Sequence, residues 1–385
     1  MLSSDISTTC GTNHPSKKES SEIVSYISEA EASKILAIIE EFAIEGQVTE
    51  IIPWGNGLIN DTYRINTDGQ EDYLLQRVNG KVYDNVDGII RNIYLVTETI
   101  RKQKFYLRNG RQKQDLHLIL RKNGELYLKD PDGSGSGWRV YNFIKDAYSI
   151  EVATEPFEMY KSGILLGQFH YLMRDFPIED IIATYPHFHD PVYHYHRLLQ
   201  AAETDLTGRA AQVQEELDFF RKHEGQYSYF NDRILQNQIP IRLTHNDAKI
   251  NNVMFDRENK EPICMVDLDT IMPGIIPFDF GDAIRSAMCT GKDTGPDMDI
   301  SRIHCDMDIY THFYRGFLEG CQGILTQEEI DDLPHGAIMI AMENAMRYLE
   351  DYLNGNVYFK VKYEEQNLIK TRMHIRLAED MMLRL

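Results

Sequence analysis

The sequence predicts an α+β protein with two lobes, an antiparallel-sheet lobe followed by a larger, mainly helical lobe. The chain has 385 residues, which is more than one ordinary hydrophobic core accommodates. Short β-rich segments separated by turn residues are concentrated before about residue 150, and helical spacing of apolar residues predominates after it. We expect a disordered tail over 1–22, an N-terminal lobe over 23–144 and a C-terminal lobe over 145–385.

In the N-terminal lobe, Ser28 and Glu31 form a capping-box pattern ahead of an apolar run, which predicts a helix. A second helix is predicted over 86–104, and the stretch 130–137 has the Gly, Ser, Asp and Pro content of a loop. Segments rich in β-branched and aromatic residues predict strands at 48–54, 61–66, 73–78, 116–120, 125–128 and 138–144.

In the C-terminal lobe, apolar residues recur at helical spacing, with a predicted helix break at Asn354–Gly355. Two short strands are predicted within this lobe, at 252–255 and 263–268.

The composition excludes several classes of function. A formal net charge of −20 would repel nucleic acid and anionic membrane surfaces. The sequence has neither an apolar run of about 18 residues nor the apolar stretch of a secretory signal. Its five cysteines include no CxxC pair, which is typical of reduced thiols. We therefore expect a cytoplasmic protein, either a monomer or a weak dimer.

One segment combines the polar side chains that carry chemistry. His245, Asp247 and Asn252 follow the pattern H-x-D-x-x-x-x-N before a predicted strand, and Asp267 lies near the end of the next one. A hairpin of these strands would bring Asn252 and Asp267 to one end of a cleft, with Asp247 across from them. Phosphoryl transfer to an alcohol needs such a set, one carboxylate for the hydroxyl proton and oxygen ligands for Mg²⁺. The alternative is a surface loop with incidental polar residues.

This pattern resembles the catalytic loop and metal-binding segment of the aminoglycoside phosphotransferase and choline kinase superfamily, small-molecule relatives of the protein kinases. The resemblance implies a bilobal, protein-kinase-like fold with ATP as phosphoryl donor. It implies that Asp247 is the catalytic base and that Asn252 and Asp267 bind Mg²⁺. His245 would then order the loop. Many relatives carry Gly where this chain has Asn246, a departure that leaves these roles intact.

The nucleotide side of the site is expected in the N-terminal lobe. A glycine-containing turn at 54–63 joins two predicted strands, and glycines let backbone N–H groups approach phosphates closely. A plain hairpin turn is the alternative for this segment. The hinge between the lobes is expected at 141–144, where the backbone would meet adenine. The residues expected to contact the nucleotide through this turn are Gly55, Gly57, Asn60 and Thr62.

A basic residue on the following strand should contact the α- and β-phosphates, but no Lys stands in the usual place. Arg77 is the candidate, with Glu98 of the next helix as its partner. Strand alternation leaves the opposite interpretation open, in which Arg77 is a solvated residue. The sequence GxxxxGK[ST] is absent, so a P-loop is not the source of kinase activity.

Several further segments resemble the N-acetylhexosamine 1-kinases over roughly residues 45–385. The resemblance implies transfer to the anomeric hydroxyl of N-acetylglucosamine or N-acetylgalactosamine, which is more acidic than an ordinary alcohol. Leu58 departs from the family, which often has His there. The segments that carry the resemblance are 55–63, 73–79, 245–256, 266–274, 278–285 and 347–361.

The same resemblance implies that Asp247 touches the acceptor hydroxyl and that Arg347 and Tyr358 contact the sugar. The alternatives are an ion pair of Arg347 with Glu343 or Asp351, and a buried core tyrosine.

Three acidic residues follow the metal-binding segment closely. Asp279 and Asp282 are expected to order the catalytic loop and a helix start. Asp269 either supports the residues that bind the substrates or is itself a carboxylate on the acceptor side, and a solvated strand end is the alternative.

Three other functions stay open. A kinase of an aminoglycoside or a choline-like amino alcohol fits the acidic net charge, and it would require several carboxylates on the acceptor side of Asp247. A non-catalytic nucleotide-binding pseudokinase fits the missing Lys. A metallohydrolase would use the histidines between His187 and His196 as zinc ligands, although a polar loop and a helix start also account for them. The choice between ATP and GTP also stays open.

Overall fold

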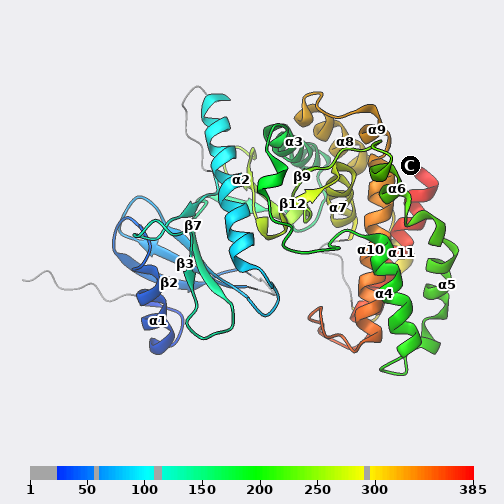
Figure 1. Ribbon diagram of the computed structural model, residues 1–385, viewed down its shortest axis with the longest axis horizontal. Coiled ribbons are helices and arrows are strands. Elements are labelled where there is room, and N and C mark those ends of the chain that lie inside the picture. The colour runs from blue at the N-terminus through cyan, green and yellow to red at the C-terminus, as the bar shows by residue number, and fades with distance from the viewer. Residues whose placement is uncertain (1–23, 56–59, 108–114, 290–294) are drawn as a thin grey trace, which may run out of the picture.

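The computed structural model describes residues 24–55, 60–107, 115–289 and 295–385. A sheet with a flanking helix forms one end of the molecule and a group of helices forms the other (Figure 1). The predicted α+β class, with an antiparallel-sheet N-terminal lobe and a helical C-terminal lobe, is confirmed. The expected disordered tail over 1–22 lies outside the described residues, as do Gly57 and Leu58.

The N-terminal sheet contains seven strands in the described part of the chain, in the order β1-β2-β3-β4-β7-β5, with β6 also paired to β7. All pairs are antiparallel except β1 with β2. The predicted strands are all present, although the two expected at 116–120 and 125–128 are only two residues long in the structure. The bounds are β1 Val24–Ser25, β2 Val48–Pro53, β3 Asp61–Thr67, β4 Tyr73–Val78, β5 Leu118–Ile119, β6 Leu128–Lys129 and β7 Gly137–Asn142.

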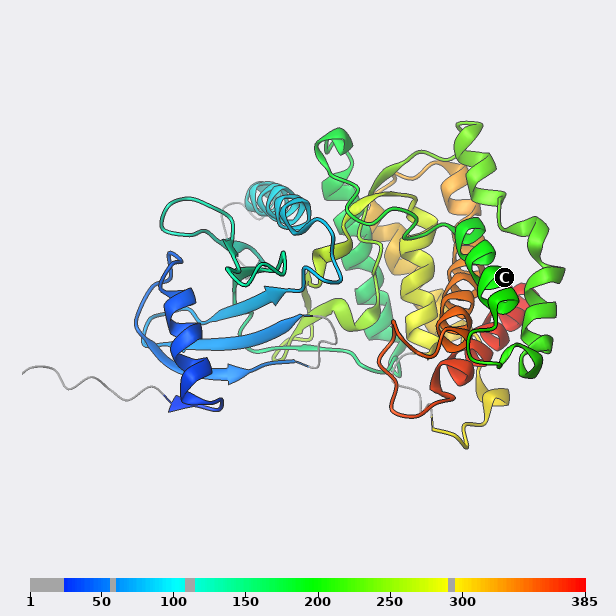
Figure 2. The same cartoon turned by 60° about the horizontal axis from the view of Figure 1, so that its bottom comes forward.

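The two faces of this sheet have different neighbours. Helix α1 (Glu29–Ile39) covers the face that carries Leu75 and Val140, and Ser28 caps it by accepting from the Glu31 N–H at 3.3 Å. Helix α2 (Val86–Leu107) lies between the sheet and the C-terminal lobe, whose core it joins (Figures 1 and 2). Because side chains alternate along a strand, adjacent residues face α1 and the C-terminal lobe in turn.

The C-terminal lobe is a group of packed helices. Helices α3 and α8 approach through glycines, since a Cβ at Gly163 would lie 2.4 Å from the carbonyl oxygen of Phe313. The predicted break at Asn354–Gly355 follows the end of α10. The bounds are α3 Pro156–Met173, α4 Pro191–Thr204, α5 Gln214–Lys222, α6 Tyr229–Leu235, α7 Ile276–Cys289, α8 Met307–Cys321, α9 Gln327–Asp331, α10 Leu333–Leu353 and α11 Gln366–Arg384. None of the helices that the structure describes is both long and apolar enough to cross a membrane.

Two small sheets carry the polar segments of this lobe. The predicted hairpin is present, and its strands pair antiparallel. Its second strand was expected to reach Leu268 but ends at Met265, because Asp267 adopts a left-handed conformation (φ +60°) that ends the extended chain. The expected lobe boundary at 144/145 falls between β7 and β8, and the division into domains there stays a prediction. The strands are β8 Ala147–Ser149, β9 Arg242–Thr244, β10 Val253–Asp256, β11 Pro262–Met265 and β12 Met272–Gly274.

Candidate active site

A buried carboxylate of α7 fixes the loop after β9. Asp279 accepts the backbone N–H groups of His245 and Asn246, each at 2.7 Å, and faces His170 at 3.3 Å. Burial would raise the pKa of Asp279, but its contacts with His170 and the His245 N–H lower it overall. This is the contact that the expected loop-ordering role requires. Asp282, by contrast, pairs with Arg285 within α7 at 2.7 Å.

Asn246 occupies a left-handed position, with φ at +62°. Glycine adopts this conformation freely, and Asn is among the few other residues that tolerate it. The Asn246 side chain is anchored as well, because it accepts from Thr244 Oγ1 and donates to the Thr270 carbonyl, both at 2.9 Å. The departure from the Gly of many relatives therefore preserves the loop conformation.

The His245 ring links the loop to the metal-binding segment. Its Nδ1 lies 3.3 Å from the Asp247 N–H and accepts it, which assigns the ring proton to Nε2. Nε2 then donates to the Val266 carbonyl at 3.1 Å, one residue before Asp267. The fully buried His245 thus sets the spacing between Asp247 and Asp267.

The hairpin brings Asn252 to Asp247. The Asn252 amide nitrogen donates to the carbonyl oxygen of Asp247 at 2.9 Å and to its Oδ2 at 3.3 Å. The carbonyl oxygen of Asn252 accepts the Val266 N–H at 2.9 Å, which places Asn252 beside the residue before Asp267. The structure therefore gathers the three side chains that the spacing predicted at one site.

The donor set at this site fits a hard divalent cation. Burial, followed by the charges of Asp247 and Asp269, raises the pKa of Asp267 to about 7, and a bound cation would favour the ionised carboxylate. Mg²⁺ prefers oxygen ligands, which Asp267 and the amide oxygen of Asn252 would supply. Among the described residues, no group of three or more His, Cys, Asp or Glu side chains could hold a metal alone. Phosphate and water oxygens would therefore complete the ligand shell.

The sequence interpretation missed Lys249, which lies beside Asp247. Its Nζ lies 2.8 Å from Asp247 Oδ1. Burial would raise the pKa of Asp247, but the Lys249 charge lowers it overall, so this carboxylate is ionised at neutral pH. A Lys two residues after the Asp, in the same loop, is the signal that could have identified it.

A polar row crosses the sheet face that is directed toward the C-terminal lobe. Gln76 pairs directly with Thr62 on β3 and with Arg139 on β7. Its Nε2 donates to Thr62 Oγ1 at 3.2 Å, and its Oε1 accepts from Arg139 Nη2 at 3.0 Å. Of these three residues, the sequence interpretation named Thr62 and missed Gln76 and Arg139.

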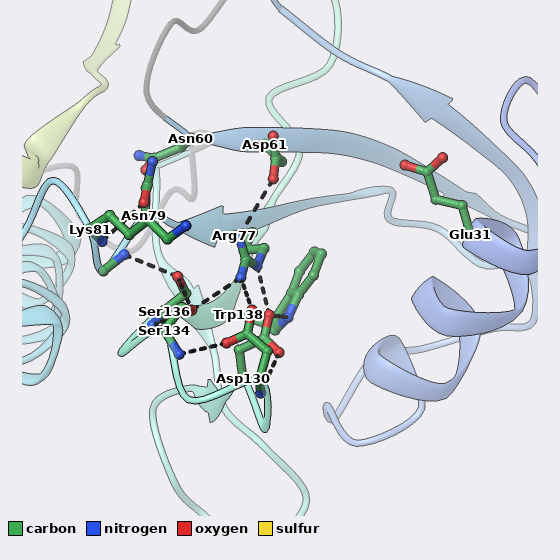
Figure 3. A network of polar contacts seen from close by, with 12 residues as sticks. Glu31, Asn60, Asp61, Arg77, Asn79, Lys81, Asp130, Ser134, Ser136 and Trp138 are labelled. Atoms are coloured by element: carbon green, nitrogen blue, oxygen red, sulfur yellow. Dashed lines mark hydrogen bonds and ion pairs between the residues drawn. The ribbon is translucent and has the colours of Figure 1, made fainter. Parts of the chain in front are cut away.

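Arg77 lies on the opposite face, so the structure does not bring it to the nucleotide side. Its Nε donates to Asp130 at 2.6 Å and its Nη2 to Asp132 at 2.5 Å. Figure 3 shows this guanidinium enclosed by the 130–137 loop, beside Trp138 and the cross-strand neighbour Asp61. Strand alternation accounts for the correction, because the adjacent Gln76 takes the other face.

The expected partner of Arg77 is also placed elsewhere. Glu98 pairs with Arg101 on α2, at 2.9 Å, and not with Arg77.

Asp269 is buried at the junction of the lobes, which corrects the alternative of a solvated strand end. It is 4% exposed and lies 2.7 Å from Arg139 Nη2. Its Oδ2 accepts from Asn60 Nδ2 at 3.0 Å, so the turn between β2 and β3 also meets this carboxylate. At the start of that turn, Gly55 has a left-handed φ of +75° with open space around it.

The Arg347 guanidinium, which the sequence predicts on the acceptor side, lies between two aromatic rings, 5.3 Å from the Phe188 centroid and 6.0 Å from that of Phe359. It makes no ion pair within 4.0 Å in the described part of the chain. Glu343, one expected partner, binds His189 at 2.8 Å instead. The His189 ring packs against Phe188, and its Nε2 contacts the Asn246 carbonyl. The aromatic cluster of Phe188, His189 and Phe359 therefore adjoins the loop that holds Asp247.

Tyr358 lies in the loop after α10, beside the same cluster. It is 51% exposed, which corrects the alternative of a buried core tyrosine, and its hydroxyl lies 3.4 Å from that of Tyr185. Asp351, the other partner considered for Arg347, instead accepts the N–H groups of Tyr358 and Phe359 at 2.8 and 2.9 Å. The Asp351 carboxylate thus fixes the loop that presents Tyr358.

The histidines between His187 and His196 do not form a metal centre in the described structure. His187 pairs with Asp190 at 2.7 Å, His189 contacts Glu343, and His194 Nε2 lies 3.3 Å from the Phe188 carbonyl. Because these partners differ, the zinc alternative has no ligand set among the described residues.

Solved structures with similar folds include several kinases of small molecules. An aminoglycoside phosphotransferase from Alicyclobacillus acidocaldarius shares 12% identity with a TM-score of 0.56, covering 90% of this chain and 92% of that one. A choline kinase from Cryptosporidium parvum shares 13% identity with a TM-score of 0.55, covering 89% and 93%. The amicoumacin kinase hAmiN, in complex with AMP-PNP, Ca²⁺ and Ami, shares 13% identity with a TM-score of 0.54, covering 91% and 93%. These likenesses show the fold.

The family of the chain follows from its sequence. Residues 50–317, more than half of the chain, match the phosphotransferase enzyme family. The chain therefore belongs to this family and is a small-molecule kinase, an ATP-dependent phosphotransferase that acts on a hydroxyl group.

Proposed function

We propose that this kinase transfers the γ-phosphate of ATP to the anomeric hydroxyl of an N-acetylhexosamine, N-acetylglucosamine or N-acetylgalactosamine. The observation that carries the proposal is the Arg347 guanidinium on the acceptor side, flanked by Phe188 and Phe359 and without an ion-pair partner in the described structure. Aromatic faces with a multidentate hydrogen-bond donor suit a neutral sugar that carries hydroxyl and acetamido oxygens. The segments that resemble the N-acetylhexosamine 1-kinases favour the same acceptor.

The charges near this cluster argue against a cationic acceptor. Arg347 is a permanent cation, and its repulsion would disfavour the ammonium groups of an aminoglycoside or of choline. Of the nearby carboxylates, Glu343 is fully buried and pairs with His189 through Oε1, and Asp351 binds backbone N–H groups. A cationic acceptor would therefore find few free carboxylates beyond those of the catalytic centre.

The reaction requires little from the protein beyond positioning and charge. Asp247 is ionised, accepts the hydrogen bond of the anomeric hydroxyl and takes its proton. The sugar oxygen forms a bond to the γ-phosphorus while the bond to the bridging β,γ-oxygen breaks, which gives a sugar 1-phosphate and ADP. The Lys249 ammonium beside Asp247 would stabilise charge on the transferring phosphoryl group. Mg²⁺, held by Asn252 and Asp267, would neutralise phosphate charge when bound.

A panel of acceptors tests the proposal. ADP release is measured with ATP and Mg²⁺ for N-acetylglucosamine, N-acetylgalactosamine, their 1-O-methyl glycosides, an aminoglycoside and choline. We expect turnover with one or both free N-acetylhexosamines and background rates with the methyl glycosides, because the glycosides lack the anomeric hydroxyl. Equal turnover of free sugar and methyl glycoside would overturn anomeric transfer. Turnover of only the aminoglycoside or choline would overturn the sugar acceptor.

A further inference from the structure

The nucleotide side of the site has no Lys on β4, yet it contains a buried guanidinium on the neighbouring strand β7. Arg139 is 1% exposed and faces the C-terminal lobe. Its Nη2 contacts both Gln76 and Asp269, whereas its Nη1 has no hydrogen-bond partner within the described structure. A buried donor without a partner is costly, and a bound anion would remove that cost.

We propose that Arg139 contacts the α- and β-phosphates of the bound nucleotide through Nη1, and that Asp269 positions Arg139 for this contact. Arg139 is thus the phosphate-binding cation, and Asp269 supplies the carboxylate partner that Glu98 does not. The inference depends on the ATP-dependent reaction and not on the identity of the acceptor.

The groups around Arg139 are compatible with this role. Its guanidinium lies 5.1 Å from the Tyr141 ring, and its strand neighbour Gln76 is a neutral amide. Asp269 is the carboxylate in direct contact, and Asp267 lies two residues away along the chain. A guanidinium can hold a carboxylate with one amino group and a phosphate with the other, because its donors diverge in a fixed plane.

Asp269 joins three parts of the site that must act together. It binds Arg139 from the sheet at 2.7 Å and Asn60 from the turn after β2 at 3.0 Å. It also lies two residues after Asp267, the expected metal ligand. A nucleotide held by Arg139 would therefore be aligned with both Asn60 and the metal-binding segment.

The test measures nucleotide binding in the absence of any acceptor, by calorimetry with ATP, ADP and adenosine in the presence of Mg²⁺. The main variant is the double substitution Arg139→Gln with Asp269→Asn, which removes both charges together and so avoids a buried unpaired carboxylate. We expect the affinities for ATP and ADP to fall by about 10- to 100-fold, because hydrogen bonds to the charged phosphates are lost. The affinity for adenosine, which has no phosphate, should not change.

Arg77→Gln is the matched control, because Arg77 is the neighbouring arginine of the same sheet and lies on its other face. We expect this variant to bind ATP within about threefold of the wild type. Unchanged ATP affinity in the double variant would overturn the proposal. An equal loss of adenosine affinity would overturn it as well, since that result indicates a distorted lobe.

Single variants separate the two roles and serve if the double variant does not fold. Arg139→Lys keeps the charge but cannot bind both Asp269 and a phosphate in the same plane. We expect ADP affinity to fall by about 3- to 10-fold, with adenosine unaffected. Asp269→Asn should give the same pattern if Asp269 acts through Arg139, and unchanged ADP affinity in that variant would contradict the positioning role. Because no acceptor is present, failure of the sugar proposal would leave these results unaffected.

Discussion

The catalytic loop and the nucleotide-facing sheet form two halves of one site, and they are built in different ways. In the loop, Asp247, Lys249 and Asn252 lie within six residues of sequence and meet through local contacts of 2.8 to 3.3 Å. On the sheet, Thr62 and Gln76 meet Arg139 only because three strands pair in one register. A local segment can therefore be interpreted from spacing alone, whereas a sheet face also requires the strand pairing and the direction of each side chain.

The largest effect is expected at the loop. Asp247→Asn removes the proton acceptor and should lower kcat by about 1,000-fold, within the range for general base catalysis. Nucleotide affinity should stay within about threefold, because the nucleotide side is formed by the sheet. Steady-state kinetics and calorimetry measure the two quantities. Asp61→Asn, an exposed carboxylate on the outward sheet face, is the control and should keep wild-type kcat. A near-normal rate for Asp247→Asn would exclude Asp247 as the base.

The same contrast explains what the sequence could predict. The fold class, the hairpin and the grouping of Asp247, Asn252 and Asp267 followed from spacing and alternation, which are local properties. Arg77 was misplaced, because a strand pattern shows that neighbours alternate but not which face meets the second lobe. Arg139 was missed because a single Arg in a strand has no signature until Asp269, more than a hundred residues later, is brought beside it.

The loop that holds Asp247 is also supported by a buried histidine, His189. His189 lies between Glu343 and the Asn246 carbonyl, each 2.8 Å from a ring nitrogen. Burial would lower the pKa of His189, but Glu343 raises it overall, and both ring nitrogens face acceptor oxygens, as an imidazolium requires. A histidine whose pKa is raised on folding stabilises the folded state. This contribution is fully present below the unfolded pKa of about 6.5, and it is lost as the pH rises through the folded pKa.

His189→Gln should therefore reduce the free energy of unfolding by about 3 kcal/mol at pH 6, since it breaks a buried pair, and by less at pH 10. Chemical denaturation at both pH values measures the difference. His196→Gln, at an exposed position on helix α4 after the turn that holds His189, is the control and should have little effect at either pH. A loss for His189→Gln that is equal at both pH values would contradict an imidazolium at this position.

A smaller effect is expected on the acceptor side. Arg347→Met keeps an apolar stem between Phe188 and Phe359 but loses the donors, so KM for the sugar should rise by about 10- to 100-fold. KM for ATP should not change. Initial rates with each substrate varied in turn supply the measurement. Arg197→Met, which removes a half-exposed ion pair with Glu350, is the control. Equal KM values for the sugar in wild type and Arg347→Met would remove Arg347 from the acceptor site.

The smallest effect is expected from the arginine on the other sheet face. Arg77→Gln breaks the contact with the buried Asp130 and should lower the free energy of unfolding by about 1 to 2 kcal/mol. KM for ATP should stay at its wild-type value. Denaturation and initial rates provide the two measurements. A large rise in KM for ATP with unchanged stability would reverse the assignment of the two faces.

The most direct test of the proposed reaction is the position of the phosphate in the product. Wild-type protein is incubated with ATP, Mg²⁺ and an N-acetylhexosamine, and the product is examined by phosphorus–proton correlation NMR. We expect a phosphorus resonance coupled to the anomeric proton of the sugar. A phosphorus coupled instead to a ring or C6 proton, or no sugar phosphate at all, would contradict it.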